Sequence, residues 1–182
     1  DPPALQTTMT QYLEDYNAIS SKPMKLVLFL FAVEHICKIA RVLQMPRGNA
    51  LLAGVGGSGR QSVTRLAAHV CDMEVFQIEV SKSYSLADWR EDLKKVLVMA
   101  GQDGKPTVFL FADTQVKEES YVEDINGLLN AGEVPNLFPS DEKATICDNV
   151  REKARDEGKE GDGSNTTMFA YFVTRCREYL HL

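Results

Sequence analysis

The sequence predicts an α/β fold in which a parallel β-sheet has helices on both of its faces. Three observations lead to this prediction. The length of 182 residues fits a single domain, since domains average about 150 residues. Apolar, β-prone runs at 49–55, 74–80 and 107–113 alternate with helical segments, the order that builds parallel sheets. Hydrophobic residues make up 44% and charged residues 25% of the chain, as in ordinary globular proteins.

The first 45 residues are predicted to form helices that lead into this α/β core. A helix is expected within residues 1–20, because apolar side chains recur there at helical spacing, at Met9, Leu13, Tyr16 and Ile19. A hydroxyl-rich stretch ending in Pro23 stops that helix and starts the next. Apolar positions three or four apart predict a long, buried helix over 24–44, which Pro46 and Gly48 end.

The strands and helices of the α/β core are predicted from hydrophobic periodicity and from residues that start or end helices. The run 49–55 ends in glycines and predicts a buried strand, while 74–80 alternates and 107–113 is continuously apolar, so both predict strands. Ser85 or Asp88 stands near the start of a predicted helix, and Gly132 follows the end of another. Helices are expected over 60–70, 85–100, 118–130, 141–154 and 166–180, with a solvated loop over 156–165.

Charge, hydropathy and cysteine usage exclude several classes of protein. The net charge is 20 − 26 = −6, which argues against broad binding to nucleic acid or anionic membranes. The apolar run 26–33 is far shorter than the roughly 20 residues of a spanning helix. The cysteines are too far apart for a zinc site and predict reduced, mostly buried thiols of an intracellular protein, at positions Cys37, Cys71, Cys147 and Cys176.

A glycine-rich segment stands between a predicted strand and a predicted helix. Such a loop points successive backbone N–H groups into one concavity at a helix N-terminus, which suits a phosphate chain. The candidate residues are Gly54, Val55, Gly56, Gly57, Ser58, Gly59, Arg60, Gln61 and Ser62. Arg60 stands where the usual pattern has lysine, and Gln61, a weaker magnesium ligand, stands where it has Ser or Thr, with Ser62 one residue late. The alternative is a plain glycine turn.

A single acid ends the apolar run 107–113. Asp113 is a candidate to orient Mg²⁺, the alternative being a strand-end or helix-cap acid. The next residues, Thr114 and Gln115, cannot act as a general base at neutral pH, and a surrogate base would have to come from Glu118 or Glu119. The residues therefore favour nucleotide binding over hydrolysis. Trp89 is expected to anchor the core, whereas Glu118, Glu119, Glu123 and Asp124 are expected to form a solvated helix face.

Three strings carry a resemblance to a known family. They are PRGNALLAGVGGSGRQS (46–62), VFLFADTQVKEESYVEDINGLLNAGEVPNLF (108–138) and FVTRCREYLHL (172–182). Together they resemble the fourth AAA+ module of dynein heavy chains, and GRQS in place of GKTT is more similar to the axonemal type. The likeness runs over most of the chain.

The resemblance implies a fold and a set of site residues. The fold is the large subdomain of an AAA+ P-loop NTPase over 46–182, after a helical approach over 1–45 and cut short before the sensor strand and lid. The AAA+ strand order is 5-1-4-3-2, and its fourth strand would begin near residues 180–182. The resemblance implies ATP or ADP at residues 54–62, with Pro46 and Arg47 near the adenine, Asp113 and Gln61 on the Mg²⁺ side, and Thr114 at the catalytic glutamate position.

The implied function is that of a nucleotide-binding regulatory module in an axonemal dynein, a microtubule motor, with hydrolysis absent or slow. The implied partners are neighbouring AAA+ modules of the same chain and, through the parent motor, the microtubule and the dynein intermediate and light chains. The implied location is the cytoplasm and cytoskeleton, in the axoneme of a cilium or flagellum. An active ATPase module that uses Ser62 or Gln61 for magnesium, a nucleotide-free structural spacer and, more remotely, a free-standing small-molecule kinase are the alternatives.

Overall fold

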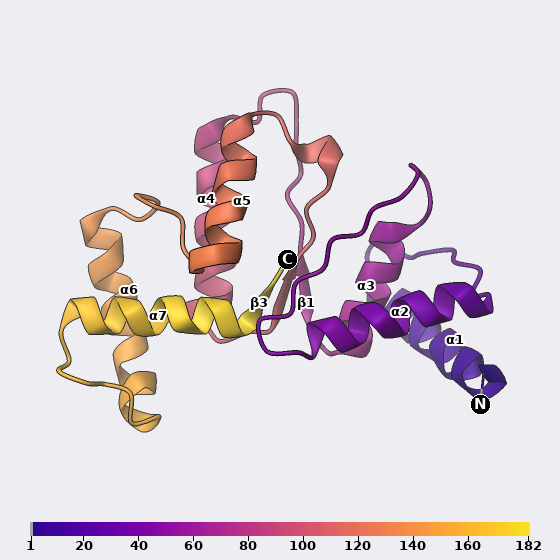
Figure 1. Cartoon of the computed structure of the whole chain (residues 1–182), viewed down its shortest axis with the longest axis horizontal. Coiled ribbons are helices and arrows are strands. Elements are labelled where there is room, and N and C mark those ends of the chain that lie inside the picture. Colours follow the sequence, from indigo (N-terminus) through magenta and orange to yellow (C-terminus); the bar gives the residue numbers. More distant parts are fainter. Residues whose placement is uncertain (1) are drawn as a thin grey trace. The chain divides into compact units, whose positions relative to one another are not determined.

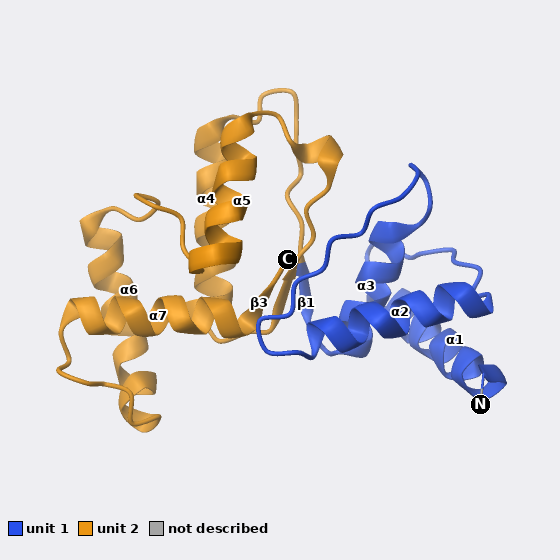
Figure 2. Ribbon diagram, viewed as in Figure 1, with its two compact units in different colours: residues 1–75 blue, residues 76–182 orange. Residues whose placement is uncertain are grey.

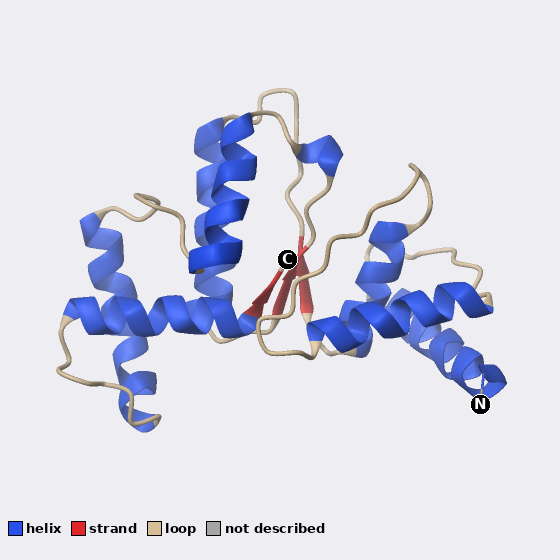
Figure 3. Ribbon diagram, in the orientation of Figure 1, coloured by secondary structure: helices blue, strands red, loops and turns tan. Residues whose placement is uncertain are grey.

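The computed structural model describes residues 2–182, which form two compact units that divide after Val75 (Figure 2). Helices make up most of both units, and the strands are short (Figure 3). Over residues 2–182, every helix falls short of the length or the hydrophobicity that crossing a bilayer requires.

The first unit contains the three helices α1 (Pro2–Ile19), α2 (Leu30–Leu43) and α3 (Arg60–Val70), and α3 packs against both of the others (Figure 1). Its buried apolar side chains include Met9, Leu13, Leu28, Val33, Ile36, Ile39, Leu43 and Leu66. The three predicted helices are therefore confirmed. Ile19, which the sequence pattern places on the buried face of α1, is instead 78% exposed because it is the last helical residue.

The periodicity predicts that the second helix begins at Met24, but α2 begins at Leu30. The side chain of Asn17 on α1 binds the backbone of Met24 twice, accepting from its N–H at 2.7 Å and donating to its carbonyl at 2.9 Å. Gln6 on the same helix donates to the carbonyl of Leu28. These bonds use backbone groups that a helix over 24–29 would need for itself, and so they keep that segment extended.

The predicted buried strand over 49–55 is wrong. No strand is assigned there, and the side chains of Leu51 and Val55 are 96% and 82% exposed (Figure 3). A strand forms only where neighbouring backbone groups pair with it. In the AAA+ order the neighbours of this segment are the fourth and fifth strands, and only Leu180 and His181 form strand at the position of the fourth.

The sheet has the strands β1 (Glu74–Phe76), β2 (Thr107–Phe109) and β3 (Leu180–His181), in the order β1-β2-β3. β2 and β3 are parallel, with Thr107 opposite Leu180 and Val108 opposite His181. This confirms that a strand begins near residue 180 beside the run 107–113, and the order matches the 4-3-2 part of the AAA+ sheet. β1 and β2 are shorter than predicted, with three residues each.

The remaining helices lie in the second unit. They are α4 (Leu86–Leu97), which continues into the π-helical turn η1 (Val98–Gln102), the 3₁₀ turn η2 (Asp113–Gln115), α5 (Glu119–Ala131), α6 (Ser140–Asp156) and α7 (Asn165–Tyr179). Ser85 and Asp88 cap the start of α4 reciprocally, and Gly132 ends α5 with φ +78°. The α/β class and the order of its helices are thus confirmed.

Trp89 joins α4 to α5, which lie side by side in Figure 1. It is fully buried, stacks on Tyr121 with ring centroids 4.4 Å apart, and donates from Nε1 to Asp124 Oδ2 at 2.8 Å. The core role predicted for Trp89 is confirmed. Asp124, predicted to lie on a solvated helix face, is instead half-buried and accepts the hydrogen bond of the Trp89 indole. Glu118, Glu119 and Glu123 are exposed, as predicted.

All four cysteines are free thiols. Cys147 and Cys176 are buried, whereas Cys37 and Cys71 are half-buried. Burial raises the pKa of the Cys147 and Cys176 thiols above the ordinary value, so both are protonated at neutral pH. The prediction of free thiols is therefore confirmed, and the predicted burial holds for Cys147 and Cys176 but not fully for Cys37 and Cys71.

Candidate functional site

The glycine-rich loop lies in the first unit and leads directly into α3. Gly57 and Gly59 have φ of +76° and +75°, a left-handed backbone that side chains other than glycine adopt only with strain. A Cβ atom at Gly56, Gly57 or Gly59 would meet no atom within 4 Å, so open space borders this stretch of backbone. Gly59 is the N-cap of α3, and no side chain caps the helix. The loop therefore presents open backbone at the positive end of a helix dipole.

Arg60 folds back onto this loop. Its Nη1 donates to the carbonyl of Leu52 at 3.0 Å, and its Nη2 donates to the carbonyl of Val55 at 3.4 Å. Its aliphatic stem passes Gly54, where a Cβ would lie 3.6 Å from Arg60 Cδ. The guanidinium thus stabilises the segment that leads into the loop. Arg60 itself directly follows Gly59, the last glycine of the loop.

The other predicted residues of this site lie on either side of the loop. Gln61 and Ser62 occupy the first turn of α3. Pro46 and Arg47 lie in the tight turn after α2, where Arg47 has φ +58° and its carbonyl accepts from Asn49 Nδ2 at 3.2 Å. A Cβ at Gly48 would lie 1.8 Å from the carbonyl oxygen of Val42, so this turn requires glycine. The first unit therefore contains all of the predicted phosphate-side and adenine-side residues.

Asp113 and Thr114 lie in the second unit, in the short turn η2 that follows β2. Both are exposed, and Asp113 Oδ1 accepts from the backbone N–H of Thr114 at 2.9 Å. Asp113 thus follows the end of β2, and an acid after a strand of the sheet is what a magnesium-orienting role requires. Within residues 2–182, no group of three or more His, Cys, Asp and Glu side chains forms a metal site by itself.

The acids considered as surrogate bases begin α5. Glu118 and Glu119 are exposed, and Glu118 Oε2 accepts from Ser120 Oγ at 3.5 Å. Their geometry is that of a solvated helix N-terminus, where negative charge is stabilised by the helix dipole.

Gln115 is a residue of this region whose role the sequence pattern does not reveal. Its side chain is only 8% exposed, and both ends of its amide are used. Oε1 accepts from the N–H of Ala112 at 2.8 Å, and Nε2 donates to the carbonyl of Ile78 at 2.6 Å. Gln115 thereby ties the turn that carries Asp113 to the segment after β1.

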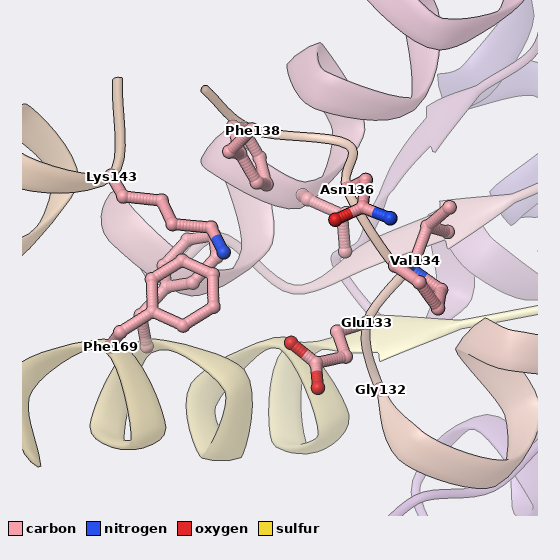
Figure 4. A pocket seen from close by; sticks show the side chains of 10 residues that line it. Gly132, Glu133, Val134, Asn136, Phe138, Lys143 and Phe169 are labelled. Carbon is pink, nitrogen blue, oxygen red and sulfur yellow. The ribbon is translucent and has the colours of Figure 1, made fainter. Parts of the chain in front are cut away.

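A separate cavity of about 180 Å³ is bordered by the string GEVPNLF (Figure 4). Phe138, Phe169 and Phe172 supply aromatic walls, and the Lys143 ammonium lies 4.9 Å from the centroid of the Phe169 ring. Glu133 supplies a carboxylate at the rim. This string, the end of the longest of the three that carry the resemblance, thus folds into the wall of a small cavity in the second unit that apolar and polar groups both line.

An open glycine loop that begins a helix, an acid just after a later strand and a parallel sheet in the order 4-3-2 define the class of AAA+ P-loop domains. The model of one family within that class, described as the P-loop containing dynein motor region D4, matches residues 24–182. The chain belongs to this family of dynein motor regions.

Axonemal dynein heavy chains are similar to nearly the whole chain. It is 50% identical over 171 residues to human dynein axonemal heavy chain 3, which covers 94% of this chain. It is 47% identical over 178 residues, 98% of this chain, to human dynein axonemal heavy chain 1. It is 48% identical to mouse dynein axonemal heavy chain 2 in an alignment 183 positions long that covers 100% of this chain. The chain spans only 4% of the length of each of these relatives.

Proposed function

We propose that this chain is a nucleotide-binding regulatory AAA+ module of an axonemal dynein motor, which binds ATP or ADP and hydrolyses it slowly or not at all. The observation that carries the proposal is the loop 54–59, which is open and left-handed at two glycines where it enters α3. A plain glycine turn into a helix does not need open backbone along several residues, whereas a loop that receives phosphates does.

The loop residues would bind and orient the phosphate chain. Backbone N–H groups near Gly57 and the N-terminus of α3 would face the phosphates, and the Arg60 guanidinium would supply positive charge. Pro46 and Arg47 would border the adenine. Mg²⁺, when bound, would neutralise charge on the phosphate oxygens. By the resemblance to the family, Asp113 and either Gln61 or Ser62 would hold it, and each of these side chains offers an oxygen donor.

The residues beside Asp113 account for slow hydrolysis. A general base must accept a proton from the attacking water, and the hydroxyl of Thr114 does not do so at neutral pH. A base of the right strength contributes about 10²- to 10⁴-fold to a rate. Without this general base, the site would keep its nucleotide bound for a long time and hydrolyse it slowly, as a regulatory module would.

The wider setting is also part of the proposal. By likeness to the axonemal dynein heavy chains, the module would contact neighbouring AAA+ modules of its own chain. Through the parent motor it would act on the microtubule of the axoneme, with the intermediate and light chains as further partners. The observation that favours a nucleotide-free structural spacer instead is that Arg60 is engaged by the carbonyls of Leu52 and Val55.

Photolabelling of the intact heavy chain with 8-azido-ADP tests the proposal at this one site. Label on peptides from residues 46–62 is quantified by mass spectrometry in the wild type, Gly57→Ala and the matched control Gly158→Ala. Gly57 and Gly158 both have positive φ, +76° and +67°, and at both positions a Cβ would meet nothing within 4 Å. The two substitutions therefore cost similar backbone strain, about 1 kcal/mol.

We expect saturable label in the wild type and in Gly158→Ala, and a loss of about tenfold or more in Gly57→Ala because a methyl group enters the space for phosphate. Absence of saturable label in the wild type would establish the spacer. Equal loss in both variants would mean that strain, and not the phosphate space, determines binding.

A further inference from the structure

We propose that Gln115 is a positioning residue for Asp113 and that Lys117 assists it, so that the segment after β1 determines where the magnesium-side carboxylate lies. The inference rests on the proposed function, because it concerns the site in which Asp113 would hold Mg²⁺. We name residues 77–85, which connect β1 to α4, the β1 exit loop. The clamp consists of Gln115 and Lys117, which reach from the turn after β2 to the backbone of this loop.

Gln115 forms the buried half of the clamp. Its amide nitrogen donates to the carbonyl of Ile78 at 2.6 Å, and its amide oxygen accepts from Ala112 N–H at 2.8 Å. Ile78 is itself buried, at 4% exposure. The amide therefore completes backbone hydrogen bonding between two chain segments where the regular pairing of β1 and β2 has already ended. Without it, the buried carbonyl of Ile78 loses its partner, at about 1–3 kcal/mol, and the half-buried N–H of Ala112 loses an acceptor.

Lys117 forms the exposed half. Its ammonium group donates to three carbonyls of the β1 exit loop, those of Ser81 at 2.6 Å, Tyr84 at 3.2 Å and Lys82 at 3.4 Å. It also lies 6.0 Å from the centroid of the Tyr84 ring. Three convergent carbonyls bind one cation with little freedom, so the loop and the segment around Lys117 move together.

Asp113 stands between the strand and the two clamping residues. The turn that carries it has three residues, and its own backbone bonds are local: Gln115 N–H to Ala112 O at 2.9 Å and Val116 N–H to Asp113 O at 3.1 Å. A 3₁₀ turn this short does not fix an exposed carboxylate by itself. The clamp supplies the long-range restraint, and a displacement of the β1 exit loop would therefore be passed to Asp113.

The choice of glutamine also follows from the geometry. A glutamate at this position could still accept from Ala112, but its second oxygen would face the carbonyl oxygen of Ile78 at the same short separation. The glutamine amide can accept from the N–H of Ala112 and donate to the carbonyl of Ile78 at the same time, which an ionised carboxylate cannot do. These two hydrogen bonds explain why residue 115, next to Thr114, is a glutamine, and they require no catalytic role for its side chain.

The test measures the magnesium dependence of nucleotide binding, which a general loss of stability would not change selectively. In the intact heavy chain, 8-azido-ADP label on residues 46–62 is titrated with Mg²⁺ and with EDTA. The variants are Gln115→Met, Lys117→Met and Asp113→Asn. The matched control is Gln102→Met, since Gln102 also bonds through its amide, to Asn149 Nδ2 at 3.0 Å.

We expect Mg²⁺ to strengthen binding in the wild type and in Gln102→Met. The gain should fall about tenfold in Gln115→Met and about threefold in Lys117→Met, while affinity in EDTA stays unchanged. A full gain in both clamp variants, or equal weakening with Mg²⁺ and EDTA, would overturn the positioning role.

Asp113→Asn separates this inference from the function on which it rests. If Asp113→Asn removes the gain and the clamp variants keep it, the clamp alone is refuted. If Asp113→Asn keeps the gain, the magnesium role of Asp113 and the clamp both fail. Should Gln115→Met fail to fold, Lys117→Met decides the question, because Lys117 is exposed and its removal leaves the core intact.

Discussion

Replacement of Arg60 by alanine probes the feature in which this loop departs most from the usual pattern. In the structure its guanidinium binds the loop's own approach segment, donating to Leu52 O at 3.0 Å and to Val55 O at 3.4 Å. A phosphate chain would compete with these carbonyls for the same donors. Arg60→Ala therefore removes a bond from the bound state and also a bond from the free state, and the measured effect is their difference.

The magnitude follows from the two terms. A charge-assisted bond from arginine to phosphate contributes about 1.5–3 kcal/mol. The bond to Leu52 has good geometry and offsets about 1 kcal/mol of this, while the bond to Val55 is near the distance limit and offsets little. The net loss is about 0.5–2 kcal/mol, or about 2- to 30-fold in affinity.

The assay is a titration of 8-azido-ADP in Mg²⁺, with label on residues 46–62 as the readout, for the wild type, Arg60→Ala and Arg60→Lys. Lysine keeps the charge, although it lacks the fork that reaches both carbonyls. We expect Arg60→Lys to bind within a few-fold of the wild type and Arg60→Ala to bind about 2- to 30-fold more weakly. An Arg60→Ala affinity within twofold of the wild type would show that Arg60 only braces its own chain.

Two further predictions concern hydrolysis and thiol chemistry. Thr114→Glu should raise the hydrolysis of ATP at this site in the motor by about 10²-fold or more, since it supplies the missing base, while Thr145→Glu, an added exposed acid on α6, should not; an unchanged rate with nucleotide bound would mean that another element limits the chemistry. In brief alkylation of the intact chain at neutral pH, Cys37 should react first and Cys176 last, because burial raises the pKa of the Cys176 thiol and keeps it protonated; modification of Cys176 at the rate of Cys37 would contradict this packing.

Helices were predictable from the sequence because their hydrogen bonds are local. The apolar period and the glycine before it place α3 over residues 60–70, and Gly132 marks the end of α5. The start of α2 was missed because Asn17, from another helix, binds the backbone of Met24, and no pattern within residues 24–44 records that contact.

Strands and long-range anchors were harder to predict because they depend on distant partners. Residues 49–55 have the composition of a buried strand, yet Leu51 is 96% exposed. A β-rich run becomes a strand only when a neighbour accepts its backbone bonds.

In the candidate site, too, local features were predictable from the sequence and long-range contacts were not. Glycine density and spacing predict the open loop that leads into α3, and its role in binding phosphate stays a prediction. The contribution of Gln115 depends on a bond to the backbone of Ile78, 37 residues earlier in the chain, and a single glutamine carries no periodic signal of such a bond.

The most direct test of the central claim is the density at residues 54–62 in the assembled motor, determined by electron cryomicroscopy in the presence of Mg²⁺ and ATP. If the loop binds nucleotide, density for a di- or triphosphate lies against Gly57 and the start of α3, with the Arg60 side chain turned away from Leu52 and towards the phosphates. A loop without nucleotide density, in which Arg60 keeps its bond to the Leu52 carbonyl, would contradict this claim.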